Sequence, residues 1–516
     1  MEFILSFPTI VTTTFSIFVF LFIYIINKKS AKNRKPPQAQ GAWPLIGHLH
    51  LLGGSELPHK VLGDLADKYG PIFTINLGSH LALVVNNADL ARECLTICDK
   101  AFASRPKALA FEIMAYNCAV FGFSPYGDYW RQARKLAMCQ VLSQRNVEML
   151  GHLRVSELRV SIKNIYHVWL ENKKEMVKVE MSSWFDELLL NIMVKIVSGN
   201  RLSSNDGDEF QVVIKNFFEL LGVFEVSDFI PFLKFLDVSG YKKRMKETWK
   251  QLDQVFEGWL KEHKMKRESS AQHQGLIDVL ITIFQRASET EFPGFDHDTT
   301  IKATCLQILT AGVDTTSGTL TWALSLLLNN PRALETARAE IDKHVGRERL
   351  VEESDMKNLV YLAAIIKETL RLHPVVPLSV PHESIEDCVV GGYNIPKGTR
   401  LLVNLSKIHR DPITWSNPHE FQPERFLTSH QDIDVKGKHF DLIPFGSGRR
   451  MCPGATFALH LLRITLASLI QQFELKPPSM EPIDMSGRFG IIISKKMPLE
   501  VLLAPRLSPR MYGAGE

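Results

Sequence analysis

The residue with the clearest chemical potential is Cys452, in the glycine-rich segment 445–454, FGSGRRMCPG. Helical spacing of apolar residues follows at 455–470, and Pro453 suits the first helical turn, where its missing N–H is not needed. A cysteine at a helix N-terminus is stabilised as the thiolate by free backbone N–H groups and the helix dipole. The glycines permit close approach of a flat ligand, and Arg450 can meet an anion. Taken alone, a single cysteine before a helix is more often structural.

A second candidate is the pair Glu368 and Arg371, in a stretch with helical periodicity at 359–372 that ends at His373-Pro374. The spacing i, i+3 places the two side chains on one face of a helix, where they can form an ion pair. By itself this spacing is typical of a solvated pair on almost any helix.

A third candidate is the run Ala311-Gly312-Val313-Asp314-Thr315-Thr316, in the middle of an apolar helix expected at 301–329. Glycine and short polar residues are poor choices for a helix interior. One interpretation is a kink whose side chains bond back to carbonyl oxygens. The other is functional, because unpartnered polar groups in an apolar pocket would be costly.

Trp130 and Arg134 form a fourth pair, at i, i+4 in a basic helix expected at 127–150. Residues four apart lie on the same helix face. Alone, the pair is typical of side chains that lie along the surface with their polar ends in water.

Together these segments resemble the cytochrome P450 superfamily. Segment 445–454 matches the pattern FxxGxRxCxG of its haem-binding loop at every fixed position, and the other motifs occur in the family's order. Arg425, in the segment Pro423-Glu424-Arg425-Phe426, follows the Glu368 motif as in the family. The resemblance covers essentially the whole chain and implies haem b, with Cys452 as the axial thiolate ligand of its iron.

The resemblance also implies a role for each matching residue. Asp314 and Thr315 would relay protons to dioxygen. Glu368, Arg371 and Arg425 would form a buried triad that holds the haem loop in place. Many relatives have arginine where this chain has His382, which weakens that one contact. The residues implied to contact haem are Trp130, Arg134, Ala311, His382, Phe445, Arg450, Cys452 and Gly454.

The implied reaction inserts one oxygen atom of O2 into a hydrophobic substrate. No flavin or nucleotide fingerprint occurs here, so electrons should come from an NADPH-dependent cytochrome P450 reductase, with cytochrome b5 as a further candidate partner. Two alternatives stay open: a haem-thiolate isomerase or dehydratase that needs no O2, and a non-catalytic haem- or lipid-binding membrane protein. Asp314-Thr315 and the complete haem motifs argue against both.

The segments that face the substrate in this family are apolar and aromatic here, with almost no fixed charge. They map to 107–124, 214–235, 305–315, 374–381 and 488–493. Such a lining predicts a hydrophobic substrate of modest size. The candidate substrate-contacting residues are Phe121, Phe224, Val376, Leu378 and Ile491.

Closer features resemble plant endoplasmic-reticulum enzymes, and most of all the eighty-second plant family of specialised metabolism. These features are WPLIGHL at 43–49, KYGPIFTINLG at 68–78, and PHESIEDCVVGGYNIPKGT at 381–399. The resemblance implies a terpenoid, a flavonoid or other phenolic, or an alkaloid as substrate.

Helical periodicity dominates the elements that must position these residues. Strand-like runs are short. The expected fold is mainly α with small β-sheets (α+β), the cytochrome P450 fold, in one large monooxygenase domain at 48–516. Helices are expected at 127–150, 180–198, 209–222, 241–266, 301–329, 331–345 and 359–372, and strands at 72–76, 81–85, 389–395 and 400–404.

The first residues predict a membrane anchor at 1–26. Residues 3–26 are uncharged and long enough to cross a hydrocarbon core of about 30 Å. Glu2 precedes the span and basic residues follow it, which predicts a retained single-pass anchor with a cytosolic catalytic domain. Residues 27–47, basic and proline-rich, are expected to be a tether. With the resemblance, this places the protein in the endoplasmic reticulum membrane.

Charge and cysteine content exclude other classes of protein. The net charge of +4 over 516 residues comes entirely from residues 1–35, so the body is formally neutral and has no charge excess for nucleic-acid binding. The seven cysteines include no CxxC pair, which argues against a disulfide scaffold or a structural zinc site.

Overall fold

The computed structural model describes most of the chain behind the leader. The predicted anchor, the first part of the tether and Phe224 lie outside the described residues. Within the described part, no helix combines the length and apolar character needed to cross a membrane. The described residues are 34–172, 175–201, 204–223, 225–230, 237, 240–268, 275–288 and 291–513.

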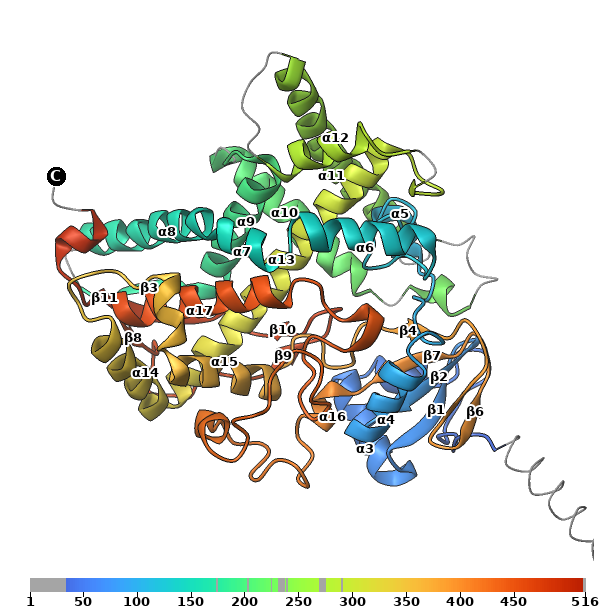
Figure 1. Ribbon diagram of the computed structural model, residues 1–516. Helices are drawn as coiled ribbons and strands as arrows, with labels where there is room; N and C mark the ends of the chain where they lie inside the picture. The colour runs from blue at the N-terminus through green and yellow to red at the C-terminus, as the bar shows by residue number, and fades with distance from the viewer. Residues whose placement is uncertain are drawn as a thin grey trace, which may run out of the picture.

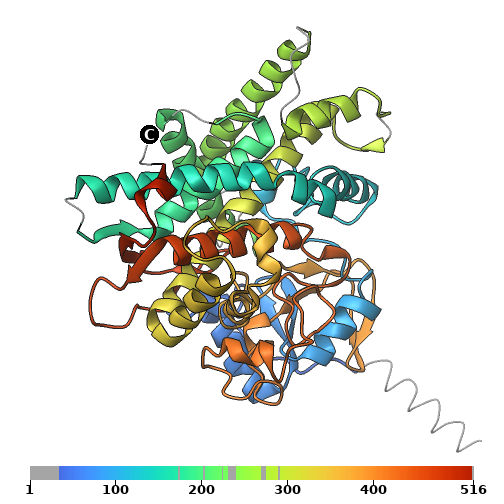
Figure 2. The same cartoon turned by 60° about the vertical axis from the view of Figure 1, so that its left-hand side comes forward.

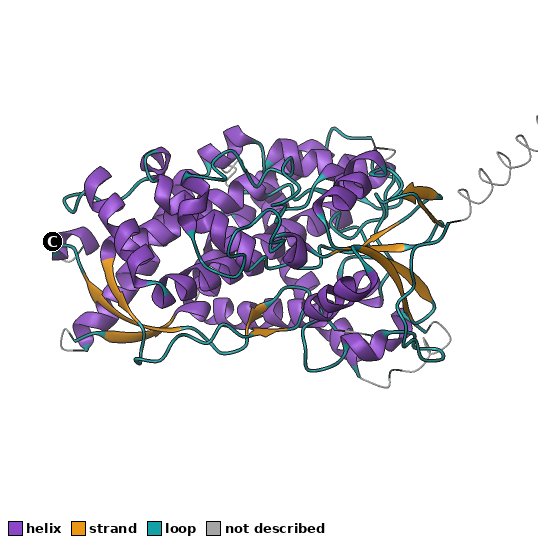
Figure 3. Cartoon of the chain, turned by 90° about the horizontal axis from the view of Figure 1, so that it is seen from below, coloured by secondary structure: helices purple, strands orange, loops and turns teal. Residues whose placement is uncertain are grey.

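Helices form the body of the molecule, most strands lie towards its two ends, and a short pair of strands lies between them (Figure 3). This confirms the predicted fold class. The longer helices are α3 (Pro58–Tyr69), α6 (Asp128–Gln140), α8 (Gly151–Glu171), α9 (Met181–Ser198), α10 (Ser204–Leu221), α11 (Tyr241–Glu268), α12 (Leu276–Phe284), α13 (His297–Asn329), α14 (Pro331–His344), α15 (Val360–Leu372) and α17 (Ala455–Gln472). The short ones are α2 (Leu49–Leu52), α4 (Ala88–Arg92), α5 (Leu109–Met114), α7 (Gln144–Met149), α16 (Leu405–Ile408), the π-helix η1 (Glu93–Ile97) and the 3-10 turns η2 (Val226–Asp228), η5 (Glu353–Lys357), η6 (Pro423–Leu427), η7 (Gly448–Arg450) and η8 (Pro509–Tyr512).

Helix α13 is the central element of the core. It packs along α9 and also contacts α11, α15 and α17, and its buried face includes Leu320, Leu324 and Leu327. The side chain of Asp296 accepts a hydrogen bond from the Thr299 N–H, so the helix begins four residues before the predicted start. Figures 1 and 2 show α8 and α17 side by side across the molecule.

The helix predicted at 127–150 is two helices, α6 and α7. After α6 the chain leaves the helical path, and the Ser143 hydroxyl accepts a hydrogen bond from Asn146 N–H to begin α7. Serine competes with the backbone for hydrogen bonds and therefore favours a helix start over a helix interior.

Four small sheets complete the fold. The largest has the order β1-β2-β7-β4; β1 pairs with β2 from Ile72↔Val85 to Leu77↔His80, and β2 runs parallel to β7. A second sheet has the order β3-β11-β8, and two hairpins join β5 to β6 and β9 to β10. The strands are β1 (Ile72–Leu77), β2 (His80–Val85), β3 (Val177–Glu180), β4 (His382–Glu383), β5 (Cys388–Val390), β6 (Tyr393–Ile395), β7 (Arg400–Val403), β8 (Phe473–Lys476), β9 (Gly487–Arg488), β10 (Ser494–Lys495) and β11 (Glu500–Pro505).

The second half of the predicted tether lies against the first sheet. Thr74 N–H donates to the Pro37 carbonyl at 2.8 Å, and Ala39 N–H donates to the Thr74 carbonyl at 3.0 Å. Residues 37–47 are therefore bound to the domain by backbone hydrogen bonds rather than forming a separate spacer. Proline suits the edge of a sheet because it has no N–H that would need a partner there.

Candidate active site

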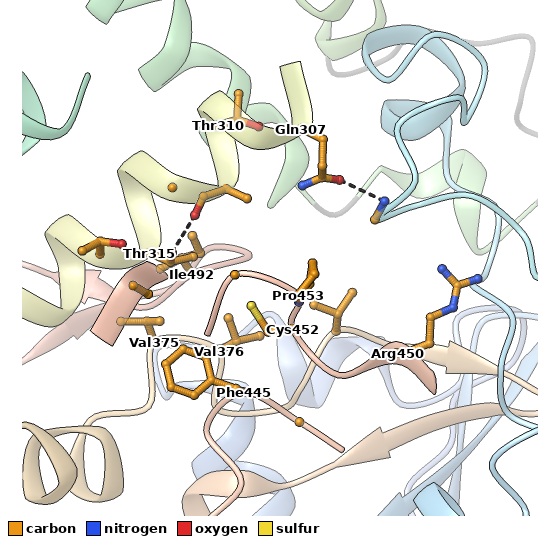
Figure 4. Close-up of a pocket in the computed structure, with 18 of the residues that line it drawn as sticks. Gln307, Thr310, Thr315, Val375, Val376, Phe445, Arg450, Cys452, Pro453 and Ile492 are labelled. Carbon is orange, nitrogen blue, oxygen red and sulfur yellow. Dashed lines mark hydrogen bonds between the residues drawn. The ribbon is translucent and has the colours of Figure 1, made fainter. Parts of the chain in front are cut away.

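A cavity of about 320 Å³ lies between α13 and the loop that carries Cys452 (Figure 4). Its walls come from the loop before α6, from α9, α10 and α13, from the segment after α15, and from residues 443–462. Most of the lining is aliphatic or aromatic. The structure thus brings the sequence motifs at 311–316 and 445–454 to opposite sides of one space.

Cys452 presents its side chain to this cavity, immediately before α17. Its backbone N–H donates to the Phe445 carbonyl at 2.9 Å, which closes the loop on itself. Burial of the site raises the pKa of the Cys452 thiol, while the Gly454 N–H and the Arg134 guanidinium act in the opposite direction. A positive charge and a backbone donor near the sulfur favour the thiolate, the form that binds metals.

The loop before Cys452 is fixed against η1. Gly448 has φ +67°, and a Cβ there would clash with the Leu95 carbonyl oxygen, so only glycine fits. Next to it, Asp99 accepts a hydrogen bond from Arg449 N–H at 3.0 Å and pairs with its guanidinium. The thiol therefore projects from a loop anchored to a separate helix.

Three guanidiniums, those of the buried Arg105 and of the half-buried Arg134 and Arg450, line the cavity. Arg450 donates to the carbonyls of Ala103 and Ser124, both at 2.6 Å, and Arg134 donates to the Met451 carbonyl at 2.6 Å. Arg105 donates to the carbonyls of Val380 and Pro381 at 2.7 and 2.9 Å. Among the residues that the structure describes, no carboxylate pairs with any of the three.

The surroundings of these three arginines disfavour their positive charges. Burial, with Arg105 and Arg134 nearby, lowers the pKa of Arg450 to about 8, and burial with Arg134 lowers that of Arg105 to about 9. Such shifts report how strongly the site disfavours the charges, since arginine keeps its proton in proteins. The sequence motifs did not identify Arg105. The available signal was an arginine within the largely apolar segment 101–111.

Trp130 and His382 lie beside the same guanidiniums. The Trp130 ring lies 4.3 Å from Arg450 and 5.7 Å from Arg134, within the range of cation–π attraction. One His382 ring nitrogen is 2.8 Å from the Phe102 carbonyl, and burial, followed by Arg105, holds the pKa of His382 well below its usual value. His382 is therefore neutral and can offer its other nitrogen to the cavity.

The structure brings Glu368, Arg371 and Arg425 together in a fully buried triad. Arg371 forms two hydrogen bonds with the Glu368 carboxylate, at 2.7 and 2.8 Å, and Arg425 donates to it at 3.0 Å. Further Arg371 donors reach the backbone carbonyls of His409 and Pro418. The triad connects α15 to η6 and to the chain that leads into the Cys452 loop, and it does not line the cavity.

On the opposite wall, Ala311 and Thr315 of α13 face the cavity. The Thr315 hydroxyl donates to the Ala311 carbonyl at 2.7 Å (Figure 4), and α13 stays helical throughout the motif. The hydroxyl bonds back to its own helix and keeps its lone pairs directed at the cavity.

Asp314 does not line the cavity, although Thr315 does. Burial and the nearby Asp186 raise the pKa of Asp314 to about 7, against the opposing effect of Arg488 and Lys215. Asp186 is itself fixed by the Ser317 hydroxyl and lies 3.7 Å from Lys215. A carboxyl that titrates near pH 7 can both give and take a proton under cellular conditions.

Of the five predicted substrate-contacting residues, Phe121, Val376 and Ile491 line the cavity. Leu378 does not; it packs against the apolar cluster of the first sheet. The reason is a turn in which Ser379 N–H donates to the Val376 carbonyl and Ser379 adopts φ +55°. This turn directs Val376 inward and Leu378 away from the cavity.

The lining residues suit haem in shape and charge. A thiol stands between apolar walls with glycines on its loop, and three buried or half-buried guanidiniums lack a carboxylate within the described chain. A flat macrocycle with two carboxylates would supply both the apolar contact and the missing negative charge. Cys452 would hold its iron, and Arg105, Arg134 and Arg450 would face its propionates.

Comparisons with known proteins agree with this arrangement. The sequence model of Cytochrome P450 matches residues 36–503. Strychnine-10-hydroxylase of Strychnos nux-vomica is 49% identical over 506 residues, 96% of each chain. Xanthotoxin 5-hydroxylase CYP82C4 of Arabidopsis thaliana is 46% identical over 522 residues, 97% of this chain and 99% of the relative. A zebra fish cytochrome P450 structure with progesterone aligns with TM-score 0.74 and 27% identity over 88% of this chain and 100% of that one.

The chain therefore belongs to the cytochrome P450 family. It is a haem-thiolate monooxygenase, and its similarity to the eighty-second plant family, predicted from the sequence, is confirmed. Family membership implies haem, a small substrate, O2 and a redox partner.

Proposed function

We propose that the protein is a hydroxylase of plant specialised metabolism. Its substrate would be a hydrophobic terpenoid, flavonoid or other phenolic, or alkaloid. The observation that carries this proposal is the apolar cavity bounded by the Cys452 thiol on one side and Thr315 on the other. Two relatives support it, because one is named for the hydroxylation of strychnine and the other for the hydroxylation of xanthotoxin.

Each part of the cavity has a distinct task in this reaction. Haem, when bound through Cys452, supplies the activation of dioxygen, favoured by electron donation from the thiolate. The apolar walls exclude water and hold the substrate against the cofactor. Thr315 holds a hydroxyl at the oxygen-facing side of α13, and Asp314, with its pKa near 7, supplies protons towards it.

Electrons are proposed to come from NADPH through a cytochrome P450 reductase, with cytochrome b5 as a further donor. Three exposed basic residues lie near the Cys452 loop: Arg131, Lys135 and Arg449. Arg131 and Arg449 already pair with Asp128 and Asp99. An acidic patch on a reductase would complement this face and orient the encounter.

The proposed location is the endoplasmic reticulum membrane, with residues 1–26 as a single-pass anchor and the catalytic domain in the cytosol. The uncharged run at 3–26 and the basic residues behind it support this topology. Deletion of residues 1–26 should release at least part of the protein from microsomes with haem still bound. Loss of haem on deletion would mean that the leader is part of the fold.

The test of the proposed reaction is turnover with reductase, NADPH and a panel of plant phenolics, terpenoids and alkaloids under ¹⁸O2. The expected product carries one labelled oxygen. Thr315→Ala should keep substrate binding but release peroxide in place of product, because the hydroxyl that supports proton delivery is gone. Unlabelled, isomerised product formed without NADPH would instead establish the isomerase alternative.

A further inference from the structure

Gln307 is a polar side chain of the cavity that has a donor group to spare and is not among the residues expected to contact haem. It lies on α13 one turn before Ala311, and residues 307, 311 and 315 share one helix face. Figure 4 shows Gln307 and Thr315 projecting from α13 towards the side that holds Cys452.

The orientation of the Gln307 amide is determined by its neighbour. Its oxygen accepts a hydrogen bond from the backbone N–H of Gly122 at 2.9 Å. Because a backbone N–H can only donate, the amide oxygen must face Gly122 and the NH2 group must face elsewhere. Within the described chain, that NH2 group has no hydrogen-bond partner, and it is not among the fully covered polar atoms.

Other polar groups of the lining are already engaged or covered. The hydroxyls of Thr310, Thr315 and Thr319 each donate to the carbonyl four residues earlier in α13, and Thr316 is buried. The Ser379 hydroxyl has no hydrogen-bond partner among the described residues, but its oxygen is fully buried and cannot reach a ligand as it stands. The three arginines are bonded to backbone carbonyls at the propionate end. Gln307 is thus set apart as a donor to a substrate.

Charge in the cavity narrows the class of substrate further. The described residues that line it include no carboxylate, whereas Arg105, Arg134 and Arg450 are all present. A protonated amine would meet the donor NH2 group of Gln307 and find no carboxylate in the described lining to balance its charge. A neutral oxygen acceptor would complete the hydrogen-bonding capacity of Gln307.

We propose that Gln307 is a specificity-determining residue that donates a hydrogen bond to a ketone or lactone carbonyl oxygen of a neutral, planar polycyclic substrate. This rests on the proposed hydroxylase function and selects oxygenated phenolics and lactones over protonated alkaloids. At about 1.5 Å rise per residue, Gln307 lies about 6 Å along α13 from Ala311 and about 12 Å from Thr315. The oxidised carbon is therefore on the part of the ring system remote from the anchored oxygen.

The test compares matched ligands that differ in one carbonyl: coumarin with 2H-chromene, and xanthone with xanthene. Full-length, haem-loaded protein is titrated with each, and affinity is read from the absorption shift of the haem and from calorimetry. Wild type should bind the carbonyl member of a pair about threefold to tenfold more tightly, the value of one neutral hydrogen bond.

Two variants separate recognition from loop positioning. Gln307→Glu, measured at pH 8, keeps an oxygen for the Gly122 N–H but loses the NH2 donor, so the preference should vanish. Gln307→Met should lose both the preference and some thermal stability, whereas Thr310→Val should keep the preference. A preference that survives in Gln307→Glu, equal affinities in wild type, or no binding of any ligand would each overturn the proposal. If wild type prefers the carbonyl ligands but forms no oxygenated product with reductase and NADPH, only the proposed hydroxylase reaction is contradicted.

Discussion

Two groups of buried or half-buried arginines support the Cys452 loop and the cavity, and they differ in what balances their charge. In the triad, Arg371 and Arg425 share the carboxylate of Glu368 at 2.7–3.0 Å. In the second group, Arg105, Arg134 and Arg450 are held by backbone carbonyls and, for Arg134 and Arg450, by the ring of Trp130.

The difference separates arginines whose charge is balanced within the chain from arginines whose charge requires a bound ligand. A buried ion is costly unless an opposite charge and hydrogen bonds offset its loss of hydration. The triad meets that requirement within the chain. The second group does not, and the low pKa values of Arg450 and Arg105 record the cost. Such a group is completed by an anionic ligand, here the haem propionates.

The largest expected effect comes from breaking the triad. Arg371→Ala leaves Glu368 and Arg425 in a site of zero or near-zero exposure with one partner missing. We expect a loss of about 3–5 kcal/mol in the free energy of unfolding, with or without haem. Urea denaturation measures it, and Lys178→Ala, which breaks an exposed pair with Glu500, is the control, with a loss of about 1 kcal/mol or less.

Asp314 extends the comparison to a carboxyl, because it is half-buried and has no ion pair among the described residues. Its pKa is near 7 in the folded protein and about 4 when unfolded. The folded state thus holds the proton more tightly, so its stability falls as pH rises from about 4 to about 7. Asp314→Asn should gain roughly 2 kcal/mol over wild type at pH 8 and almost none at pH 4.5.

Thermal unfolding of wild type and Asp314→Asn across this pH range measures the effect. A stability difference that stays constant with pH would contradict the raised pKa of Asp314. Asp64→Asn, at an exposed carboxyl of α3, is the control substitution.

A smaller effect is expected from Arg450→Ala, and it should depend on haem. Without haem, removal of Arg450 leaves no carboxylate unpaired, so the unfolding free energy should change less than in Arg371→Ala. With haem, release of the cofactor to apomyoglobin should be about tenfold faster, equivalent to about 1.4 kcal/mol. Arg450→Lys keeps the positive charge but lacks the planar guanidinium, so its rate of haem release should lie between those of wild type and Arg450→Ala. Equal rates of haem release from Arg450→Ala and wild type would contradict the claim that Arg450 pairs with the cofactor.

The elements that could be predicted from the sequence are those whose signals are local. Helical periodicity located α9, α11 and α13 to within a few residues, and the motifs assigned Cys452 and Thr315 to one haem site. Spacing predicted that Glu368 and Arg371 could pair, but their burial was implied only by the family resemblance, because it depends on η6, which is distant in the chain.

The parts that could not be predicted depend on packing across the chain. Arg105 becomes part of the haem end only because the loop after α15 presents the carbonyls of Val380 and Pro381 to it. Leu378 was misplaced because a turn at Ser379 reverses side-chain direction. Gln307 lies in the segment 305–315 expected to face the substrate, but the orientation of its amide could not be predicted, because it depends on Gly122 reaching α13 from another segment.

The central claim is that Cys452 holds the haem iron as a thiolate. The carbon monoxide difference spectrum of reduced Cys452→Ser tests it most directly, with Cys139→Ser, at an exposed cysteine, as the matched control. We predict that the red-shifted band of thiolate-ligated haem disappears in Cys452→Ser and remains in Cys139→Ser. An unchanged red-shifted band in Cys452→Ser would contradict the account.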